Sequence, residues 1–123
     1  MNLFLIMFFL HCVDDFFLQG MWLSNGKQKS WWEKNAPDEK YKYDYLAALF
    51  IHAFEWSAII SIPLIFIGLN PYILFGIFFV NGCIHAYVDN LKANKHKINL
   101  IVDQSIHIIQ IIITCVGINL CGH

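Results

Sequence analysis

The sequence predicts an all-α protein, a four-helix transmembrane bundle with a polar cluster of His and Asp in the cytoplasmic half of the membrane. Three observations lead to this prediction. The 123 residues are 58% hydrophobic and only 14% charged, whereas a soluble domain carries about 25% charged residues. Four apolar stretches are each long enough to cross a bilayer. Ionisable side chains recur inside these stretches at helical spacing.

The four expected spans cover residues 2–23, 45–69, 72–91 and 98–120 of a single domain, 1–123. Each contains about 20 mostly apolar residues, the length that a spanning helix needs. The first segment lacks a basic leading region and a small-residue cleavage site, so we interpret it as a retained helix and not as a signal peptide. Asn70 and Pro71 form the turn between the second and third spans, because proline cannot continue the preceding helix.

The distribution of lysine predicts an orientation. All eight basic residues are lysines, and they lie in the two connections at residues 24–44 and 92–97. With four spans, both connections fall on the same side of the membrane. The positive-inside rule places this side in the cytoplasm and both termini outside. No continuous basic patch is formed, so we expect no nucleic-acid partner.

The long connection, residues 24–44, also contains aromatic residues among its charges. Trp31 and Trp32 are followed by Tyr41 and Tyr43, and Tyr45 begins the next span. Such amphipathic rings favour the headgroup layer, so we expect an interfacial loop in contact with membrane lipids.

Polar side chains inside the spans are the most informative feature, because they are costly in lipid and mark functional sites. His and Asp form three pairs with i, i+4 spacing, which places both members of a pair on one helical face. The second span adds one further histidine. Counted along the helices at about 1.5 Å per residue, all seven residues fall in the cytoplasmic half. They are His11 and Asp15, His52, His85 and Asp89, and Asp103 and His107.

The charge of this cluster predicts a bound cation. No lysine lies inside an expected span, and Lys92 is expected to extend toward the interface. Buried carboxylates without a partner are costly, and imidazole with carboxylate suits a divalent metal, Zn²⁺ or Mn²⁺. We therefore expect His11, Asp15, His52, His85, Asp89, Asp103 and His107 to bind one or two ions, the latter bridged by a carboxylate.

Five other polar residues receive supporting roles. Asp14 and Glu55 lie off the main faces and are candidates for a catalytic general base, or for groups that support the ligands. Gln19, Lys92 and Gln104 are expected to orient ligands or to bind an anionic substrate.

The motifs His11-xxx-Asp15-Phe16-xx-Gln19, His85-xxx-Asp89-xx-Lys92 and Asp103-Gln104-xx-His107 together resemble a family of small bacterial and phage membrane proteins, catalogued as a domain of unknown function. The resemblance covers nearly the whole chain. That family is distantly similar to membrane-bound metal-dependent hydrolases. The resemblance implies a bacterial inner-membrane protein with an intramembrane metal site, and hydrolysis as its chemistry.

The leading functional hypothesis is a metal-dependent hydrolase that acts at the inner leaflet on a phosphoester or ester bond, such as one in a lipid headgroup. One alternative is a proton or metal-ion transporter, although the apolar stretches 59–67 and 109–116 argue against a polar path through one chain. Another is a non-enzymatic phage membrane effector with a structural metal site. A homo-oligomer is left open by the sequence.

Overall fold

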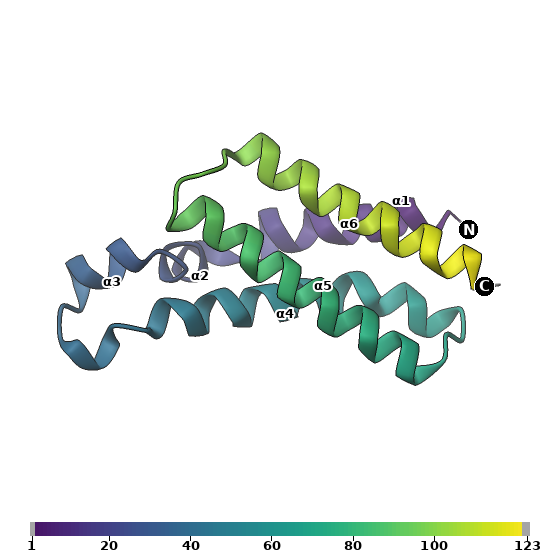
Figure 1. Cartoon of the computed structure of the whole chain (residues 1–123), viewed down its shortest axis with the longest axis horizontal. Helices are drawn as coiled ribbons and strands as arrows, with labels where there is room; N and C mark the ends of the chain where they lie inside the picture. The colour runs from purple at the N-terminus through teal and green to yellow at the C-terminus, as the bar shows by residue number, and fades with distance from the viewer. Residues whose placement is uncertain (1, 122–123) are drawn as a thin grey trace.

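The computed structural model describes residues 2–121, which form an all-helical bundle (Figure 1). Helices α1, α4, α5 and α6 run along the long axis, while α2 and α3 lie at one end, beside the connection between α5 and α6 (Figure 1). The elements are α1 (Leu3–Val13), a π-helical turn (Asp14–Leu18), α2 (Gly20–Gly26), α3 (Lys29–Asn35), a 3-10 turn (Glu39–Tyr41), α4 (Asp44–Phe66), α5 (Pro71–Ala93) and α6 (Leu100–Leu120).

Three helical segments are long and apolar enough to cross a membrane, and they end at Phe66, Ala93 and Leu120. A fourth crossing is formed if α1 and its bent continuation count as one span. Large apolar side chains also cover the outer surface of the bundle, which suits hydrocarbon as the surrounding solvent. Those that are more than half exposed include Phe9, Phe17, Phe66, Tyr72, Ile101 and Leu120.

The expected first span, residues 2–23, does not form one straight helix. After α1 the chain enters the π-helical turn, in which the Gln19 N–H donates to the Asp14 carbonyl, five residues back, at 2.9 Å. Gly20 then adopts a φ of +65°, which side chains other than glycine rarely adopt. There α2 bends by 89° from the preceding helix. The expected first span is therefore a bent pair of helices, because Gly20 redirects the chain.

Helices α4 and α5 pack closely because a glycine faces an aromatic ring. A Cβ placed on Gly82 would lie 2.7 Å from the ring of Phe54, and Ser57 Oγ donates to the Phe78 carbonyl at 2.7 Å. Small residues of this kind let helix backbones approach in a membrane. The turn between α4 and α5 lies at Asn70 and Pro71, as the sequence predicts. The side chain of Asn70 caps the start of α5 by accepting a hydrogen bond from the Tyr72 N–H at 2.9 Å.

The apolar core fills the end of the bundle where α1 begins and α6 ends. Trp56 lies at the boundary between this core and the polar cluster described below. The core consists of Met7, Trp56, Ile60, Leu64, Leu69, Ile111, Cys115 and Ile118. The polar cluster therefore lies toward the other end, where α2, α3 and the α5–α6 connection are found (Figure 1).

The expected interfacial loop, residues 24–44, begins inside the bundle. The Trp32 indole N–H donates to the Gly26 carbonyl at 2.8 Å. The side chain of Asn94, at the end of α5, donates to the Lys27 carbonyl at 2.9 Å and accepts from the Lys29 N–H at 2.6 Å. These contacts attach α2 and the start of α3 to the end of α5.

Candidate metal centre

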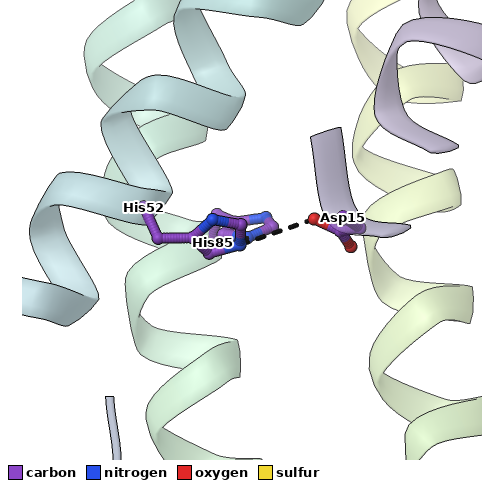
Figure 2. Close-up of side chains that lie close together, drawn as sticks. All are labelled: Asp15, His52 and His85. Carbon is purple, nitrogen blue, oxygen red and sulfur yellow. Dashed lines mark hydrogen bonds and ion pairs between the residues drawn. The ribbon is translucent and has the colours of Figure 1, made fainter. Parts of the chain in front are cut away.

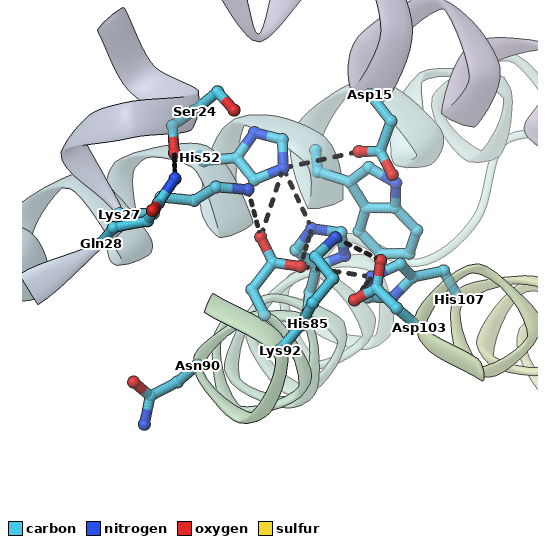
Figure 3. A network of polar contacts seen from close by, with 12 residues as sticks. Asp15, Ser24, Lys27, Gln28, His52, His85, Asn90, Lys92, Asp103 and His107 are labelled. Carbon is cyan, nitrogen blue, oxygen red and sulfur yellow. Dashed lines mark hydrogen bonds and ion pairs between the residues drawn. The ribbon is translucent and has the colours of Figure 1, made fainter. Parts of the chain in front are cut away.

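The seven His and Asp side chains singled out by the sequence come together in one cluster. Figure 3 labels Asp15, His52, His85, Asp103 and His107 among them. They come from α1, the π-helical turn, α4, α5 and α6. Six of them are buried, and the side chain of Asp15 is 8% exposed. The i, i+4 spacing produces this convergence because each pair turns one polar face toward the bundle axis.

Three imidazoles direct their Nε2 atoms toward the Asp oxygens. His52 Nε2 lies 3.2 Å from His85 Nε2 and 3.4 Å from Asp15 Oδ1, and Figure 2 shows these three side chains facing one another. His107 Nε2 lies 3.4 Å from Asp89 Oδ1 and 3.4 Å from Asp103 Oδ1. The rings of His85 and His107 stack, with centroids 3.9 Å apart.

These spacings fit co-ligands of a metal ion. Ligands about 2.0–2.1 Å from a tetrahedral ion lie about 3.3–3.4 Å from one another. Unshared hydrogen bonds from N–H to O are mostly shorter, about 2.9–3.0 Å. Within residues 2–121, Asp15 Oδ1, Asp103 Oδ1 and His107 Nε2 are buried without a hydrogen-bond partner. Because buried polar atoms are normally paired, these three atoms are available to coordinate a cation.

The potential ligands form two groups of three that share His85. One group is Asp15, His52 and His85, and the other is His85, Asp89 and His107; in each group the ligand atoms lie within 4.8 Å of one another. Imidazole nitrogen and carboxylate oxygen are the donor set of Zn²⁺ and Mn²⁺ sites. The residues present therefore fit a divalent ion.

Two lysines pair with the cluster, which corrects the expectation that no basic residue balances its charge. Lys27 Nζ lies 2.5 Å from Asp89 Oδ2, and both side chains are buried. Lys92 Nζ lies 2.5 Å from Asp103 Oδ2, with the Lys92 side chain 29% exposed. Lys92 therefore turns inward and does not extend to the interface. The absence of a balancing charge is no longer an argument for a metal, which rests instead on the convergence of ligand atoms.

Lys27 is the functional residue that sequence reasoning missed. The sequence predicts Lys27 in the interfacial loop, but the bend at Gly20 returns α2 toward the bundle and places Lys27 against the cluster (Figure 3). One signal was present, because Gly20 and Gly26 bracket a short apolar stretch before Lys27. Gly26 allows close packing, since a Cβ there would lie 3.4 Å from Ala48 Cβ.

The π-helical turn brings both Asp14 and Asp15 to the inside of the bundle. In a regular α-helix neighbouring residues diverge by about 100°, whereas a π-helical turn widens the helix locally and is frequent at functional sites. Asp14 is fully buried and lies 3.8 Å from His52 Nδ1, on the side of the ring opposite the Nε2 that faces Asp15. The distance is too long for a hydrogen bond, and within residues 2–121 both Asp14 oxygens and His52 Nδ1 are buried without a hydrogen-bond partner.

His11 lies at the edge of the cluster and has a defined partner. The Trp56 indole N–H donates to His11 Nδ1 at 2.8 Å, which occupies the lone pair on that nitrogen. The Trp56 ring also stacks on His85, with centroids 4.3 Å apart. His11 belongs to neither group of three described above. The structure thus places it beside the potential ligands as a hydrogen-bonding neighbour.

The predicted supporting residues are partly brought to the cluster. Gln104 Nε2 donates to Asp15 Oδ2 at 3.0 Å and to Asp103 Oδ2 at 3.1 Å. Gln19 accepts from Lys27 Nζ and donates to the Asp15 backbone carbonyl at 3.2 Å, when its amide oxygen faces the lysine. Glu55 is half-buried and makes no hydrogen bond or ion pair within residues 2–121.

A chain of polar contacts leads from the cluster to a groove between α5 and α6. His107 Nδ1 lies 3.1 Å from Gln110 Oε1, and Gln110 Nε2 donates to the Asn81 carbonyl at 3.2 Å. Asn81 in turn donates to Thr114 Oγ1 at 3.0 Å. Gln110, Asn81 and Thr114 line an apolar cavity of about 400 Å³, which also extends along Gly76 and Gly117.

Comparison with known proteins gives a family and no activity. No curated protein and no solved structure shows a significant match to the chain. A family described as "Protein of unknown function (DUF3307)" matches residues 3–122. The predicted membership of a family of unknown function is thereby confirmed, and the chain belongs to the DUF3307 family.

Proposed function

We propose that this chain is a four-span protein of the bacterial inner membrane whose cluster binds a divalent metal ion and hydrolyses a phosphoester or ester bond of a lipid headgroup at the inner leaflet. One observation carries the proposal. Imidazole Nε2 and carboxylate oxygen atoms from different helices converge at 3.2–3.7 Å, and several of them are buried without another partner.

The positions of the lysines support the proposed topology. The lysines of α3 and of the α5–α6 connection lie at the same end of the bundle, and the start of α1 and end of α6 lie at the other (Figure 1). The positive-inside rule then orients the lysine end toward the cytoplasm. The cluster is nearer this end, because His85, Asp89 and Asp103 are within about three turns of the α5–α6 connection.

In this proposal the cluster residues divide into ligands and groups that orient them. Asp15, His52, His85, Asp89, Asp103 and His107 hold the ion. Asp14 lies beside His52 Nδ1, and Gln104 holds Asp15 and Asp103 together through two hydrogen bonds. When bound, a divalent ion supplies a Lewis acid for the scissile group and acidifies a water molecule.

The proposed substrate approaches where the cluster is least covered. Lys92 has the most exposed charged side chain among the contacts of the cluster, and Gln104 is half-buried beside it. An ammonium group at this position attracts an anionic headgroup. Lys92 can pair with a phosphate oxygen in place of Asp103, which frees the carboxylate for the ion.

The groove between α5 and α6 supports a lipid as the substrate. It begins one hydrogen bond away from His107, at Gln110, and runs toward the end of the bundle where α6 ends. Its volume of about 400 Å³ lies in the range of small-molecule sites, about 300–1,000 Å³. A hydrocarbon chain in this groove would keep the bond to be cleaved near the cluster.

The apolar core counts against transport by a single chain. Beyond Gln110, the interior is filled by Ile60, Leu64, Ile111 and Ile118. A path for protons or ions needs polar groups over the whole membrane depth, and a tightly packed apolar layer interrupts it.

The first test is metal analysis of the purified protein in detergent. We expect wild type to retain zinc or manganese, and a variant with His85→Ala and Asp89→Ala to lose it. Equal and negligible metal in both proteins would remove the basis of the proposal.

The second test compares the lipids of cells that express wild type or the Asp89→Asn variant. A headgroup change seen with wild type alone is expected, and identical lipid profiles would contradict hydrolysis of membrane lipids.

A further inference from the structure

Each of the two Asp89 oxygens faces the Nε2 atom of a different histidine, so that this carboxylate lies between His52 and His107. Asp89 Oδ2 lies 3.7 Å from His52 Nε2 and accepts from Lys27 Nζ. Asp89 Oδ1 lies 3.4 Å from His107 Nε2 and 3.7 Å from His85 Nε2. A carboxylate in this position can bind one cation with each oxygen.

Each side of Asp89 also has a second carboxylate. Asp15 Oδ1 is 3.4 Å from His52 Nε2, and Asp103 Oδ1 is 3.4 Å from His107 Nε2. Asp15 Oδ1 and Asp103 Oδ1 are both buried without a hydrogen-bond partner in the described part of the chain. The same set, one histidine and one aspartate, is therefore repeated on the two sides.

We infer that Asp89 is a bridging carboxylate between two divalent ions, one held by Asp15 and His52 and the other by Asp103 and His107. The inference rests on the proposed metal-dependent function and makes its site a two-ion site. His85 Nε2 has a single lone pair, so His85 joins one of the two ions. Helical bundles form carboxylate-bridged sites of this kind from facing helices, and the ions of two-metal sites lie about 3.5–4 Å apart.

The charge of the site predicts an anionic substrate. The site holds four carboxylates, those of Asp14, Asp15, Asp89 and Asp103, and two ammonium groups, of which Lys27 pairs with Asp89 and Lys92 with Asp103. With all four carboxylates ionised and the histidines neutral, as metal ligands are, one divalent ion balances the two remaining negative charges. A second ion leaves a surplus of positive charge that a phosphate group offsets. The second ion is therefore expected to bind more tightly when inorganic phosphate is present, and the favoured substrate is a phosphoester.

Manganese titration of the full chain in detergent tests the inference. Bound Mn²⁺ is counted by elemental analysis, and electron paramagnetic resonance reports whether two ions are coupled. Wild type with phosphate should bind two ions per chain and give an exchange-coupled spectrum. His52→Gln and His107→Gln should each retain one ion with an uncoupled six-line spectrum, because each variant keeps the opposite side intact. Asp89→Asn should abolish the coupling.

His96→Asn is the matched control, because His96 is exposed in the α5–α6 connection at a φ of 51° that asparagine tolerates. It should bind two coupled ions. Gel filtration and circular dichroism establish that each variant is folded. One ion per wild-type chain, or two ions without coupling, overturns the inference but leaves the proposed metal-dependent function in place. No bound ion in wild type overturns both.

Discussion

Lys27 is the residue on which the charge of the cluster depends most directly. It is a buried lysine, paired with Asp89 and held by Gln19. Buried ion pairs contribute little net stability when both partners are present, but removal of one partner leaves an uncompensated buried charge. The same lysine lies where it competes with a cation for Asp89 Oδ2, so stability and metal binding are linked at this position.

Replacement of Lys27 by methionine is expected to destabilise the metal-free protein by about 3–5 kcal/mol, because the buried Asp89 carboxylate then loses its lysine partner. Added Zn²⁺ or Mn²⁺ should recover most of this loss by binding the folded state. Thermal unfolding in detergent, with and without a chelator, measures both effects. Lys29→Met is the control: its exposed pair with Glu33 is worth at most about 1 kcal/mol. Equal effects of the two substitutions would contradict the role of Lys27.

His11 illustrates how a partner decides the role of a histidine. The sequence predicts that His11 is a metal ligand. In the structure, His11 Nδ1 instead accepts a hydrogen bond from the Trp56 indole N–H. Trp56 in turn packs flat against His85. His11 therefore holds the Trp56 ring in place against His85.

The substitution His11→Gln should therefore leave the number of bound metal ions unchanged, while His52→Gln lowers it. A stability loss of about 1–3 kcal/mol is expected if the Trp56 N–H loses its acceptor. Elemental analysis and thermal unfolding of the same samples separate the two effects. Loss of metal from the His11 variant, with the fold intact, would instead make His11 a ligand.

At the scale of the elements, the unusual segment is the break between α1 and α2. The π-helical turn admits two consecutive aspartates to the interior, and Gly20 then sends α2 across the end of the bundle. Pattern reasoning cannot detect this break, because the apolar residues from Phe16 to Leu23 continue the composition of a span. The consequence is that a segment expected at the interface supplies Lys27 to the cluster.

Helix α5 contains two glycines, Gly76 and Gly82, that together test how closely it packs against α4. In Gly82→Ala the new Cβ would meet the Phe54 ring at 2.7 Å, so the helices must separate. We expect a destabilisation of about 1–3 kcal/mol. Gly76→Ala, in the same helix, meets nothing within 4 Å and should be neutral or stabilising by up to about 1 kcal/mol. Thermal unfolding of both variants in one detergent gives the comparison, and similar values would contradict the close contact.

At the scale of the whole molecule, polar and apolar halves are segregated along the bundle. The His and Asp cluster lies toward the lysine end, and the core around Trp56, Ile60 and Ile111 lies toward the other. The groove between α5 and α6 joins the two halves. This arrangement provides one polar site with an adjacent apolar groove, which suits the proposed hydrolysis of a lipid.

Filling the groove should therefore impair lipid hydrolysis without loss of metal. Gly117→Leu places a side chain in open space within the groove. We expect a several-fold decrease of the lipid change in cells, with wild-type metal content in the purified protein. Ala58→Leu adds the same bulk on an exposed face of α4, outside the groove, and should have no effect. An unchanged lipid profile with Gly117→Leu would exclude the groove from substrate binding.

The proposed topology predicts which side of the membrane each end of the bundle faces. Single cysteines are introduced at Lys34, Lys95 and Tyr72 after replacement of the four native cysteines by serine. An impermeant maleimide should modify the Tyr72→Cys variant in intact cells with an opened outer membrane. Lys34→Cys and Lys95→Cys should react only once the inner membrane is permeabilised. The reverse pattern would invert the topology, and labelling of all three from outside would contradict four spans.

The sequence by itself determined the helices α4, α5 and α6 and the meeting of His and Asp residues. Both follow from local physics: apolar length sets a membrane-crossing helix, and i, i+4 spacing sets the polar face. The tertiary structure alone decided how the cluster is neutralised and how its members divide their roles. Lys27 reaches Asp89 through the bend at Gly20, and Trp56 binds His11 from another helix. Such contacts depend on backbone direction and on partners 45 to 62 residues apart, which no periodicity along the chain encodes.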